Sequence, residues 1–353
     1  MSEPLKEATE YCFSFGPWNI HEGTDPFGPP VREPFSFDEK VGVYRDLGFV
    51  GIQFHDDDIV PDIDEKTYTQ LIARTKAVKK QIDDHGLTAE VVAPRLWESP
   101  QTLDGAYTSN SEKERHYALE RSKRCVDIAN EIGCRNLVLW LAREGTYIRE
   151  TKDAAGAVGQ ILEAINALLD YDPEIRILIE PKPNEPMDIA YIPTIGHAIG
   201  LAYASDAPER VGGLIESAHA ILAGLEPSDE MGYALCHQKL WSVHLNDQNG
   251  LKFDQDKAFG SVNLRRAFNQ VRVLEENGYG RNGEFIGLDV KVMRTQPRDI
   301  STKHLLSSRR TFLNLLEKVR TFDKDVEQEF IAARDYEGLD FYILEHLLGA
   351  ECV

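Results

Sequence analysis

The sequence has few of the features that mark secreted, membrane or nucleic-acid-binding proteins. Its cysteines number five, an odd count, and no C-x-x-C pair occurs, which argues against a disulfide framework and against a zinc ribbon. No apolar run reaches the length of a membrane span, and the start, "MSEPLKEATEY", lacks the basic and apolar parts of a signal peptide. We therefore expect a reduced, cytoplasmic protein that does not bind a membrane.

Positive charge is also scarce. Lysine and arginine together number 39 against 59 aspartates and glutamates, so the formal net charge is −20. Nucleic acids and anionic membranes attract basic surfaces, and neither is an expected partner. The excess of carboxylates is instead compatible with binding divalent cations.

The sequence does contain a regular alternation of short apolar segments and longer helical patterns. Buried strands are predicted at 12–18, 49–54, 89–93, 136–140, 175–180, 211–215, 241–245 and 285–290. Helices are predicted at 65–86, 111–133, 157–170, 262–278 and 302–321, and "SFDE" from Ser36 to Glu39 is a capping box. Eight apolar strands alternating with helices predict a closed (β/α)₈ TIM barrel. We expect this barrel in residues 1–322 and a C-terminal helical extension in 323–353, which packs on a neighbouring subunit or on its own barrel.

Chemically versatile side chains follow the predicted strands. The carboxyl ends of barrel strands form one rim, where active sites lie. The residues expected at this rim are Trp18, His55, Trp97, Trp140, Glu180, Glu216, His244 and Asp289. Taken singly, an acidic run such as "HDDD" (55–58) is more often a solvated loop, and rim tryptophans often only pack. The convergence of all of them on one face indicates a functional site.

Several of these side chains have a second candidate close by in the sequence. The pairs are Glu180 with Lys182, Glu216 with His219, Asp254 with Asp256, and Asp289 with Lys291. Each pair alone is also compatible with a surface salt bridge or a turn. Together they are rich in oxygen ligands with one or two imidazoles, which suits Mg²⁺, Mn²⁺ or Co²⁺ better than structural zinc. The five carboxylates would be nearly neutralised by two divalent cations and two lysines, so we expect two ions.

A set of short motifs recurs in one order along the chain. They are "FSFGPW", "DPFG", "FHDDD", "REG", "EPKPNEP", "GHA", E-x-x-H, "HLNDQNGLKFDQD" and "LDVK", from about residue 13 to about residue 320. In this order they resemble the shorter class of xylose isomerase. The resemblance implies a (β/α)₈ barrel, usually a tetramer, in which two divalent cations help to convert an aldose into its ketose.

The resemblance also implies roles for the matched residues. Glu180, Glu216, His244 and Asp289 would hold one metal, and Glu216, His219, Asp254 and Asp256 the other. His55, oriented by Asp58, would promote opening of the sugar ring, and Lys182 would bind the oxygen at C1. Trp18, Trp97, Trp140, Arg95 and Lys291 are candidates for contacting the sugar, and Phe27 would reach into a neighbouring subunit's site. Hydrogen would move between C1 and C2 as a hydride, with a proton-transfer route left open.

Two positions depart from the family pattern. The family's "H-I-D-L-N" is "S-V-H-L-N" in this chain, so that His244 stands where a carboxylate is usual. The segment "T-T-N-L-F" is "A-P-R-L-W", from Ala93 to Trp97, which introduces Arg95 and a larger ring. The metal ligands are therefore expected to be kept, while the sugar end of the pocket differs.

Other functions remain open at this point. A sugar epimerase of the same barrel superfamily would use paired carboxylates, whereas Lys182 and His55 favour an isomerase. A related endonuclease would need basic loops, which the net charge of −20 opposes. A non-catalytic sugar-binding relative is the third alternative. In each case the expected partners are a small sugar and other copies of the chain.

Overall fold

Eight parallel strands close into a barrel in the part of the chain that the computed structural model describes, residues 11–25 and 27–349. Around the barrel their order is β1-β10-β9-β8-β6-β4-β3-β2, so consecutive barrel strands are spatial neighbours. Their bounds are β1 Cys12–Phe15, β2 Gly51–His55, β3 Thr88–Ala93, β4 Asn136–Trp140, β6 Arg176–Glu180, β8 Val211–Glu216, β9 Leu240–Leu245 and β10 Phe285–Leu288. The predicted (β/α)₈ TIM barrel is confirmed.

The first strand is shorter than the sequence predicts. It ends at Phe15 rather than at residue 18, because Pro17 has no amide hydrogen for a strand ladder and begins a short 3₁₀ helix, Pro17–Asn19. This turn carries Trp18 to the edge of the cavity at the strand ends.

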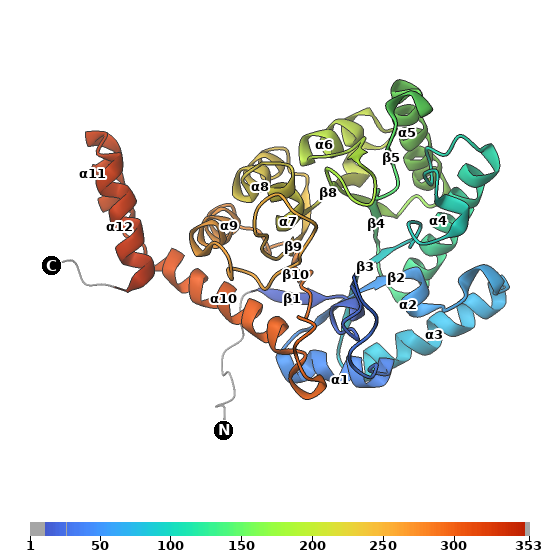
Figure 1. The fold of residues 1–353 in the computed structure, drawn as a ribbon, viewed down its shortest axis with the longest axis horizontal. Coiled ribbons are helices and arrows are strands. Elements are labelled where there is room, and N and C mark those ends of the chain that lie inside the picture. The colour runs from blue at the N-terminus through green and yellow to red at the C-terminus, as the bar shows by residue number, and fades with distance from the viewer. Residues whose placement is uncertain (1–10, 26, 350–353) are drawn as a thin grey trace.

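A ring of helices surrounds the strands, as Figure 1 shows. The ring contains α1 Phe37–Leu47, α3 Tyr68–Asp84, α4 Glu112–Ile132, α5 Ala154–Tyr171, α6 Ile195–Ala204, α8 Pro227–Cys236, α9 Leu264–Glu276 and α10 Lys303–Arg320. Short helices α2 (Asp56–Ile59) and α7 (Ser217–Leu222) directly follow β2 and β8, and β5 (Gly145–Thr146) pairs with β7 (Ile189–Ala190). The capping box predicted at α1 is confirmed, since Ser36 Oγ accepts from Glu39 N and the Glu39 carboxylate accepts from Ser36 N.

The barrel interior has its own small apolar cluster. It consists of Val91, Ala93, Val138, Leu178 and Leu214, and a much larger apolar core lies between the strands and the helices. Val91, Ala93 and Val138 also line the cavity at the carboxyl ends of the strands. The barrel is thus filled below the cavity, and chemistry is confined to its rim.

Two further helices, α11 (Lys324–Ala333) and α12 (Tyr336–Leu348), extend away from the ring (Figure 1). A bidentate ion pair from Arg272 to Glu327 attaches α11 to α9, at 2.7 Å for both contacts. The arm exposes the large apolar side chains of Ile331, Tyr336, Phe341, Leu344 and Leu348. The C-terminal extension is therefore helical as predicted, and its packing on another subunit stays a prediction.

Four of the five cysteines lie within the described residues. Cys12, Cys125, Cys134 and Cys236 are all free, and Cys352 lies outside the described residues. Within residues 11–25 and 27–349, no helix combines the length and the apolar character that crossing a bilayer requires.

Candidate metal centre and sugar pocket

A cavity of about 680 Å³ opens at the carboxyl ends of the barrel strands. All of the predicted site residues line it except Phe27 and Asp58. Asp58 lies behind His55, with Oδ2 3.3 Å from His55 Nδ1, and its role as an orienting carboxylate stays a prediction. Phe27 is 81% exposed and contacts Phe253 on the cavity wall, with 6.1 Å between ring centroids.

Strand geometry explains why the acidic residues meet. Glu180 and Glu216 are the last residues of β6 and β8, and Asp289 directly follows β10. Asp254 and Asp256 lie on the loop after β9, which is closed by reciprocal backbone hydrogen bonds between Asp247 and Lys257 at 2.9 Å. Parallel strands end at one level, so residues far apart in sequence become neighbours.

Glu216 is the centre of this cluster. It belongs to three groups of residues, and within each group the potential ligand atoms lie within 4.8 Å of one another. The partners of Glu216 are Glu180 and His219 in one group, His244 and Asp289 in the second, and Asp254 and Asp256 in the third. Oε1 of Glu216 lies 3.3 Å from Nε2 of His219, and Oε2 lies 3.8 Å from Nδ1 of His244. Glu216 is thus the one residue common to all three groups, and the division of the others between two ions stays a prediction.

The buried carboxylates of the cluster cannot all be ionised at neutral pH, because burial and mutual repulsion raise the pKa of two of them. Burial, followed by the charge of Asp254, raises the pKa of Asp256 to about 8 and that of Glu216 well above its usual value. Burial would also raise the pKa of Glu180, but the charge of His244 lowers it to about 2. Burial would lower the pKa of His244, yet Glu180 raises it well above the usual value. The ligands therefore hold protons that cations can displace.

The donor set fits divalent cations. His219 Nδ1, both ring nitrogens of His244 and Oδ1 of Asp254 are buried and have no hydrogen-bond partner among the described residues. Buried polar atoms without a partner are costly, and metal coordination satisfies them. Carboxylate oxygens with two imidazoles suit Mn²⁺, Co²⁺ or Mg²⁺.

Two lysines balance part of the charge. Lys182 Nζ lies 2.8 Å from Asp254 Oδ2, and Lys291 Nζ lies 2.6 Å from Asp256 Oδ2. Burial would lower the pKa of Lys182, but Asp254 raises it to about 12. The charge of Asp256 raises the pKa of Lys291 as well. Both side chains are therefore cations at neutral pH.

Three supporting residues escaped prediction from the sequence. The buried amide of Asn246 donates to Glu216 Oε1 at 2.9 Å, to Asp256 Oδ1 at 3.3 Å and to the carbonyl of Asp289 at 2.9 Å. Asn19 Nδ2 donates to Asp289 Oδ1 at 2.7 Å. Glu185 accepts from Lys182 at 3.3 Å and from the backbone N–H of Asp254 at 3.1 Å. Only Asn246 could have been found from the sequence: it lies two residues after His244, so the two side chains are expected on the same side of an extended backbone.

Gly287 makes room for the His244 ring. It is the register partner of His244 on β10, and a Cβ built on it would lie 2.4 Å from the Val243 carbonyl oxygen and 3.2 Å from His244 Cδ2. A side chain at 287 would therefore displace the strand or the imidazole.

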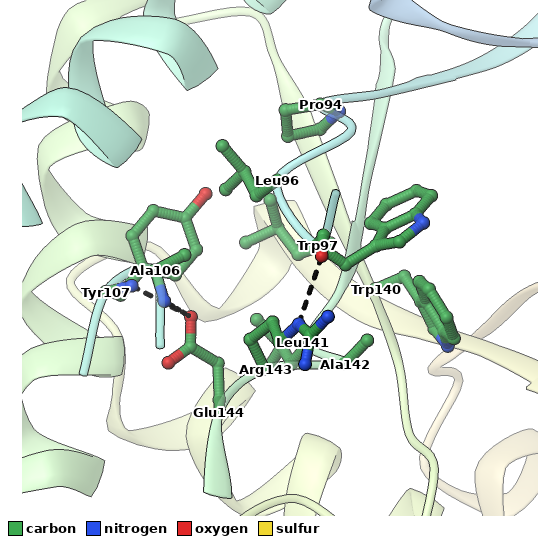
Figure 2. Close-up of a pocket in the computed structure, with 11 residues that line it drawn as sticks. Pro94, Leu96, Trp97, Ala106, Tyr107, Trp140, Leu141, Ala142, Arg143 and Glu144 are labelled. Carbon is green, nitrogen blue, oxygen red and sulfur yellow. Dashed lines mark hydrogen bonds between the residues drawn. The ribbon is translucent and has the colours of Figure 1, made fainter. Parts of the chain in front are cut away.

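Tryptophans form a wall of the cavity. Trp97 and Trp140 meet edge to face, with 4.5 Å between ring centroids, and Trp140 lies parallel to the His219 ring at 6.5 Å. Figure 2 shows the support behind this wall: Arg143 Nε donates to the Trp97 carbonyl at 3.0 Å, and Glu144 accepts backbone hydrogen bonds from Ala106 and Tyr107. The "REG" motif thus holds the wall rather than lining the metal cluster with its glutamate.

His55 lies at the other side of the cavity, between aromatic rings. Its ring centroid is 4.2 Å from that of Trp18 and 5.1 Å from that of Trp97. A further group of potential ligands, His55 with Asp57 and Asp58, also lies within 4.8 Å. Arg95 contacts this group, with Nε 2.9 Å from Asp57 and Nη2 2.6 Å from His55, so its charge opposes a metal ion there.

Fold and site together define a barrel with an acidic, imidazole-containing cation cluster at its rim. The chain matches the family described as "Xylose isomerase-like TIM barrel" over residues 41–290, and it belongs to that family. A protein named xylose isomerase from Thermus thermophilus is 35% identical over 331 residues, which cover 92% of this chain and 84% of that protein.

Solved structures also resemble this chain. One is 3-keto-D-glucoside 4-epimerase from E. coli, with a TM-score of 0.62 and 14% identity over 85% of this chain and 99% of the other. Another is a D-tagatose 3-epimerase-like protein, with a TM-score of 0.62 and 15% identity over 87% of this chain and 98% of the other. At such low identity these similarities concern the fold alone.

Proposed function

We propose that this protein is a divalent-metal-dependent aldose–ketose isomerase that acts on a free monosaccharide by ring opening and a 1,2-hydride shift. The observation that carries the proposal is Glu216, whose carboxylate belongs to three ligand groups beside two protonated lysines. The identity of 35% to a protein named xylose isomerase supports the same reaction class.

In this proposal the acidic cluster holds two divalent cations. Glu180, Glu216, His244 and Asp289 hold one of them, and Glu216, His219, Asp254 and Asp256 hold the other. When bound, such cations supply Lewis-acid polarisation of sugar oxygens. Six of these seven side chains, all but Asp289, are at least nine-tenths buried. They are therefore already fixed in place, and binding an ion costs them little conformational entropy.

Lys182 is the residue proposed to bind the oxygen at C1. Its pKa of about 12 means that it donates hydrogen bonds at neutral pH and is no proton-abstracting base. Asp254 and Glu185 fix its ammonium group. Charge develops on the C1 oxygen during isomerisation, and a fixed cation stabilises it.

The other carboxylates of the cavity favour hydride transfer over proton transfer. Outside the metal cluster, the acids among the described lining residues are Asp25, Glu98 and Glu185. Each is paired with a cation: Asp25 with Arg294, Glu98 with Arg95 and Glu185 with Lys182. None of these three acids is therefore an unpaired carboxylate placed to abstract a proton from a sugar carbon. Hydride transfer needs no such base.

Hydride transfer also requires a pocket that excludes water, and three tryptophans provide its apolar surface. Trp18, Trp97 and Trp140 offer flat apolar faces that stack on the C–H side of a sugar and exclude water. Trp18 also donates from Nε1 to Asp289 Oδ1 at 3.0 Å, which joins the wall to the metal cluster. Phe54, Val91 and Val138 continue the apolar lining.

A labelled-substrate assay tests the proposal. Aldoses that carry deuterium at C2 are incubated with Mn²⁺-loaded protein, and NMR follows ketose formation and epimer formation separately. A hydride shift retains the deuterium at C1 of the ketose, whereas proton transfer exchanges it with solvent. Retention with ketose as the main product is expected. Formation of epimers alone identifies an epimerase, and turnover of no sugar with or without metal identifies a binding protein.

The matched control is Lys182→Met, which keeps the length of the side chain and removes its charge. It is expected to retain metal and to lose ketose formation by roughly 10²–10³-fold, the effect of removing one preorganised donor. A variant that isomerises sugars at the natural rate contradicts the role of Lys182.

A further inference from the structure

Two groups compete for one nitrogen atom of His55. Nη2 of Arg95 lies 2.6 Å from Nδ1 of His55, and Oδ2 of Asp58 lies 3.3 Å from the same atom. A guanidinium only donates hydrogen bonds, and an ionised carboxylate only accepts them. Nδ1 accepts from Arg95 when it carries no proton and donates to Asp58 when it carries one. A single tautomer cannot satisfy both, and the shorter contact is the one to Arg95.

Arg95 is anchored independently of His55. Its Nε donates to Asp57 Oδ1 at 2.9 Å, and its Nη1 lies 3.3 Å from Glu98 Oε1. Burial would lower the pKa of Arg95, but the charges of Asp57 and Asp58 raise it overall. The guanidinium therefore stays protonated, and the two anchors hold Nη2 against the imidazole.

Asp58 is also held in place by a backbone hydrogen bond. Its Oδ2 accepts the backbone N–H of His55 at 2.8 Å, which is the capping bond of α2. Its place thus does not depend on a proton at Nδ1. The ring itself is confined between Trp18 and Trp97, which opposes the rotation that would exchange its two nitrogens.

We propose that Arg95 is a positioning residue that holds His55 in the tautomer with its proton on Nε2. In that form Nε2 donates a hydrogen bond to the sugar and cannot take a proton from it. The alternative tautomer, with Nδ1–H paired to Asp58 and Nε2 bare, forms when the guanidinium withdraws. Arg95 therefore acts on the ring-opening step through His55, and this consequence rests on the proposed function.

The difference matters because ring opening needs a base. The bond between C1 and the ring oxygen breaks, and the C1–O1 bond becomes a carbonyl. The hydroxyl at C1 gives its proton to the base, the ring oxygen takes a proton from water, and the hydroxide left behind recovers the proton held by the base. A bare Nε2 can be that base, whereas a protonated Nε2 cannot.

Nitrogen-15 NMR tests the tautomer directly. The full-length, metal-free protein with labelled histidine is measured at about pH 8, where a free imidazole is neutral. The His55 signals are assigned by their loss in His55→Gln. We expect the proton on Nε2 in the natural protein and on Nδ1 in Arg95→Asn. Glu98→Gln is the matched control and is expected to leave the tautomer unchanged, because Asp57 still anchors Arg95. A natural protein already protonated on Nδ1 overturns the inference, even if Arg95→Asn does not fold.

Anomer exchange tests the consequence for ring opening. Interconversion of the α and β anomers of a pyranose requires ring opening but no isomerisation, and NMR exchange measures its rate. A placed general base contributes roughly 10²–10⁴-fold, so Arg95→Asn is expected to speed the exchange by at least about 10-fold. The double variant Arg95→Asn with Asp58→Asn is expected to lose this gain. Equal rates in Arg95→Asn and the natural protein contradict the effect on ring opening. Neither measurement depends on ketose formation, so failure of the proposed isomerase activity is seen separately.

Discussion

Glu216 and His244 stand opposite each other as register partners on the neighbouring strands β8 and β9, with 3.8 Å between Oε2 and Nδ1. Paired residues of parallel strands lie at one level of the barrel, so these two side chains meet without help from a loop. The residue that departs from the family pattern therefore contacts the carboxylate that both proposed ion sites share. A change at either position is expected to alter the same centre.

Removing the shared carboxylate should damage both ion sites. The natural protein is expected to bind two Mn²⁺ ions, measured by calorimetry and elemental analysis. Glu216→Gln should lose both tight sites, because all three ligand groups of the acidic cluster contain Glu216. Asp289→Asn is the control and should weaken one ion only, since Asp289 belongs to a single group. Loss of one ion in Glu216→Gln would contradict the bridge.

Stability without metal should fall as pH rises from about 6.5 to 8, a range above the titration of the buried His21 and His304, whose pKa burial lowers to about 4. The folded-state pKa of Asp256 is about 8, far above the value of about 3.9 for an unfolded aspartate. Because the folded state binds the extra proton, its contribution to stability is present at low pH and is lost as pH rises through 8. The melting temperature in EDTA should decline over this range, and the gain on adding Mn²⁺ should grow.

The control for that pH dependence is Asp256→Asn, which removes one titrating group and should make the decline shallower. Part of the decline should remain, because the pKa values of Glu216 and His244 are raised as well. Glu180 does not interfere, because its pKa of about 2 places its own loss of stability below the range measured. A metal-free melting temperature that rises from about pH 6.5 to 8 in the natural protein would count against the protonated cluster.

His244 should shift the preference among ions. Imidazole favours Mn²⁺ or Co²⁺ over Mg²⁺, and it must be neutral to bind any of them. The variant His244→Asp is expected to restore use of Mg²⁺ and to extend activity to lower pH. Activity with each ion across pH tests this for both proteins. Equal activity with Mg²⁺ and Mn²⁺ in the natural protein, unchanged in the variant, means that His244 is no ligand.

Asn246 should matter almost as much as a ligand. Its amide donates to Glu216, Asp256 and the Asp289 carbonyl, so Asn246→Ala is expected to weaken Mn²⁺ affinity by roughly 10- to 100-fold. Asn246→Asp should be worse, because it adds a negative charge where two donors were. Calorimetry with Mn²⁺ measures both. An affinity unchanged in Asn246→Ala would show that strand geometry alone orients the ligands.

Assembly should complete the pocket. Phe27 is 81% exposed beside the cavity, and the α11–α12 arm exposes further apolar side chains. We expect a dimer or tetramer by light scattering, and a smaller species when the chain is cut after residue 322. Phe27→Ala should keep the assembly and raise KM, if a neighbour's site receives this ring. A fully active monomer would rule the prediction out.

The barrel could be predicted from the sequence because each of its strands is recognisable from a few consecutive residues. Each strand is a short apolar run, and each rim residue follows one of them. Contacts between distant loops are another matter. Lys182 and Asp254 are 72 positions apart, and Arg95 and His55 are 40 apart. The sequence assigns Arg95 to the sugar end of the pocket but does not predict its ion pairs: Arg95 lines the cavity and also contacts Asp57, Asp58 and Glu98. Hydrophobic periodicity predicts helices and strands, but it does not predict which loops pack against each other.

Gly287 shows which part of this site cannot vary. A Cβ at 287 would lie 2.4 Å from the Val243 carbonyl oxygen, 2.6 Å from Gln53 Nε2 and 3.2 Å from the Cδ2 atom of His244. The two shortest of these contacts do not involve residue 244, so the strand pair requires glycine at 287 whether histidine or aspartate stands at 244. The ligand at 244 can therefore be exchanged in one mutational step, without a compensating change at 287.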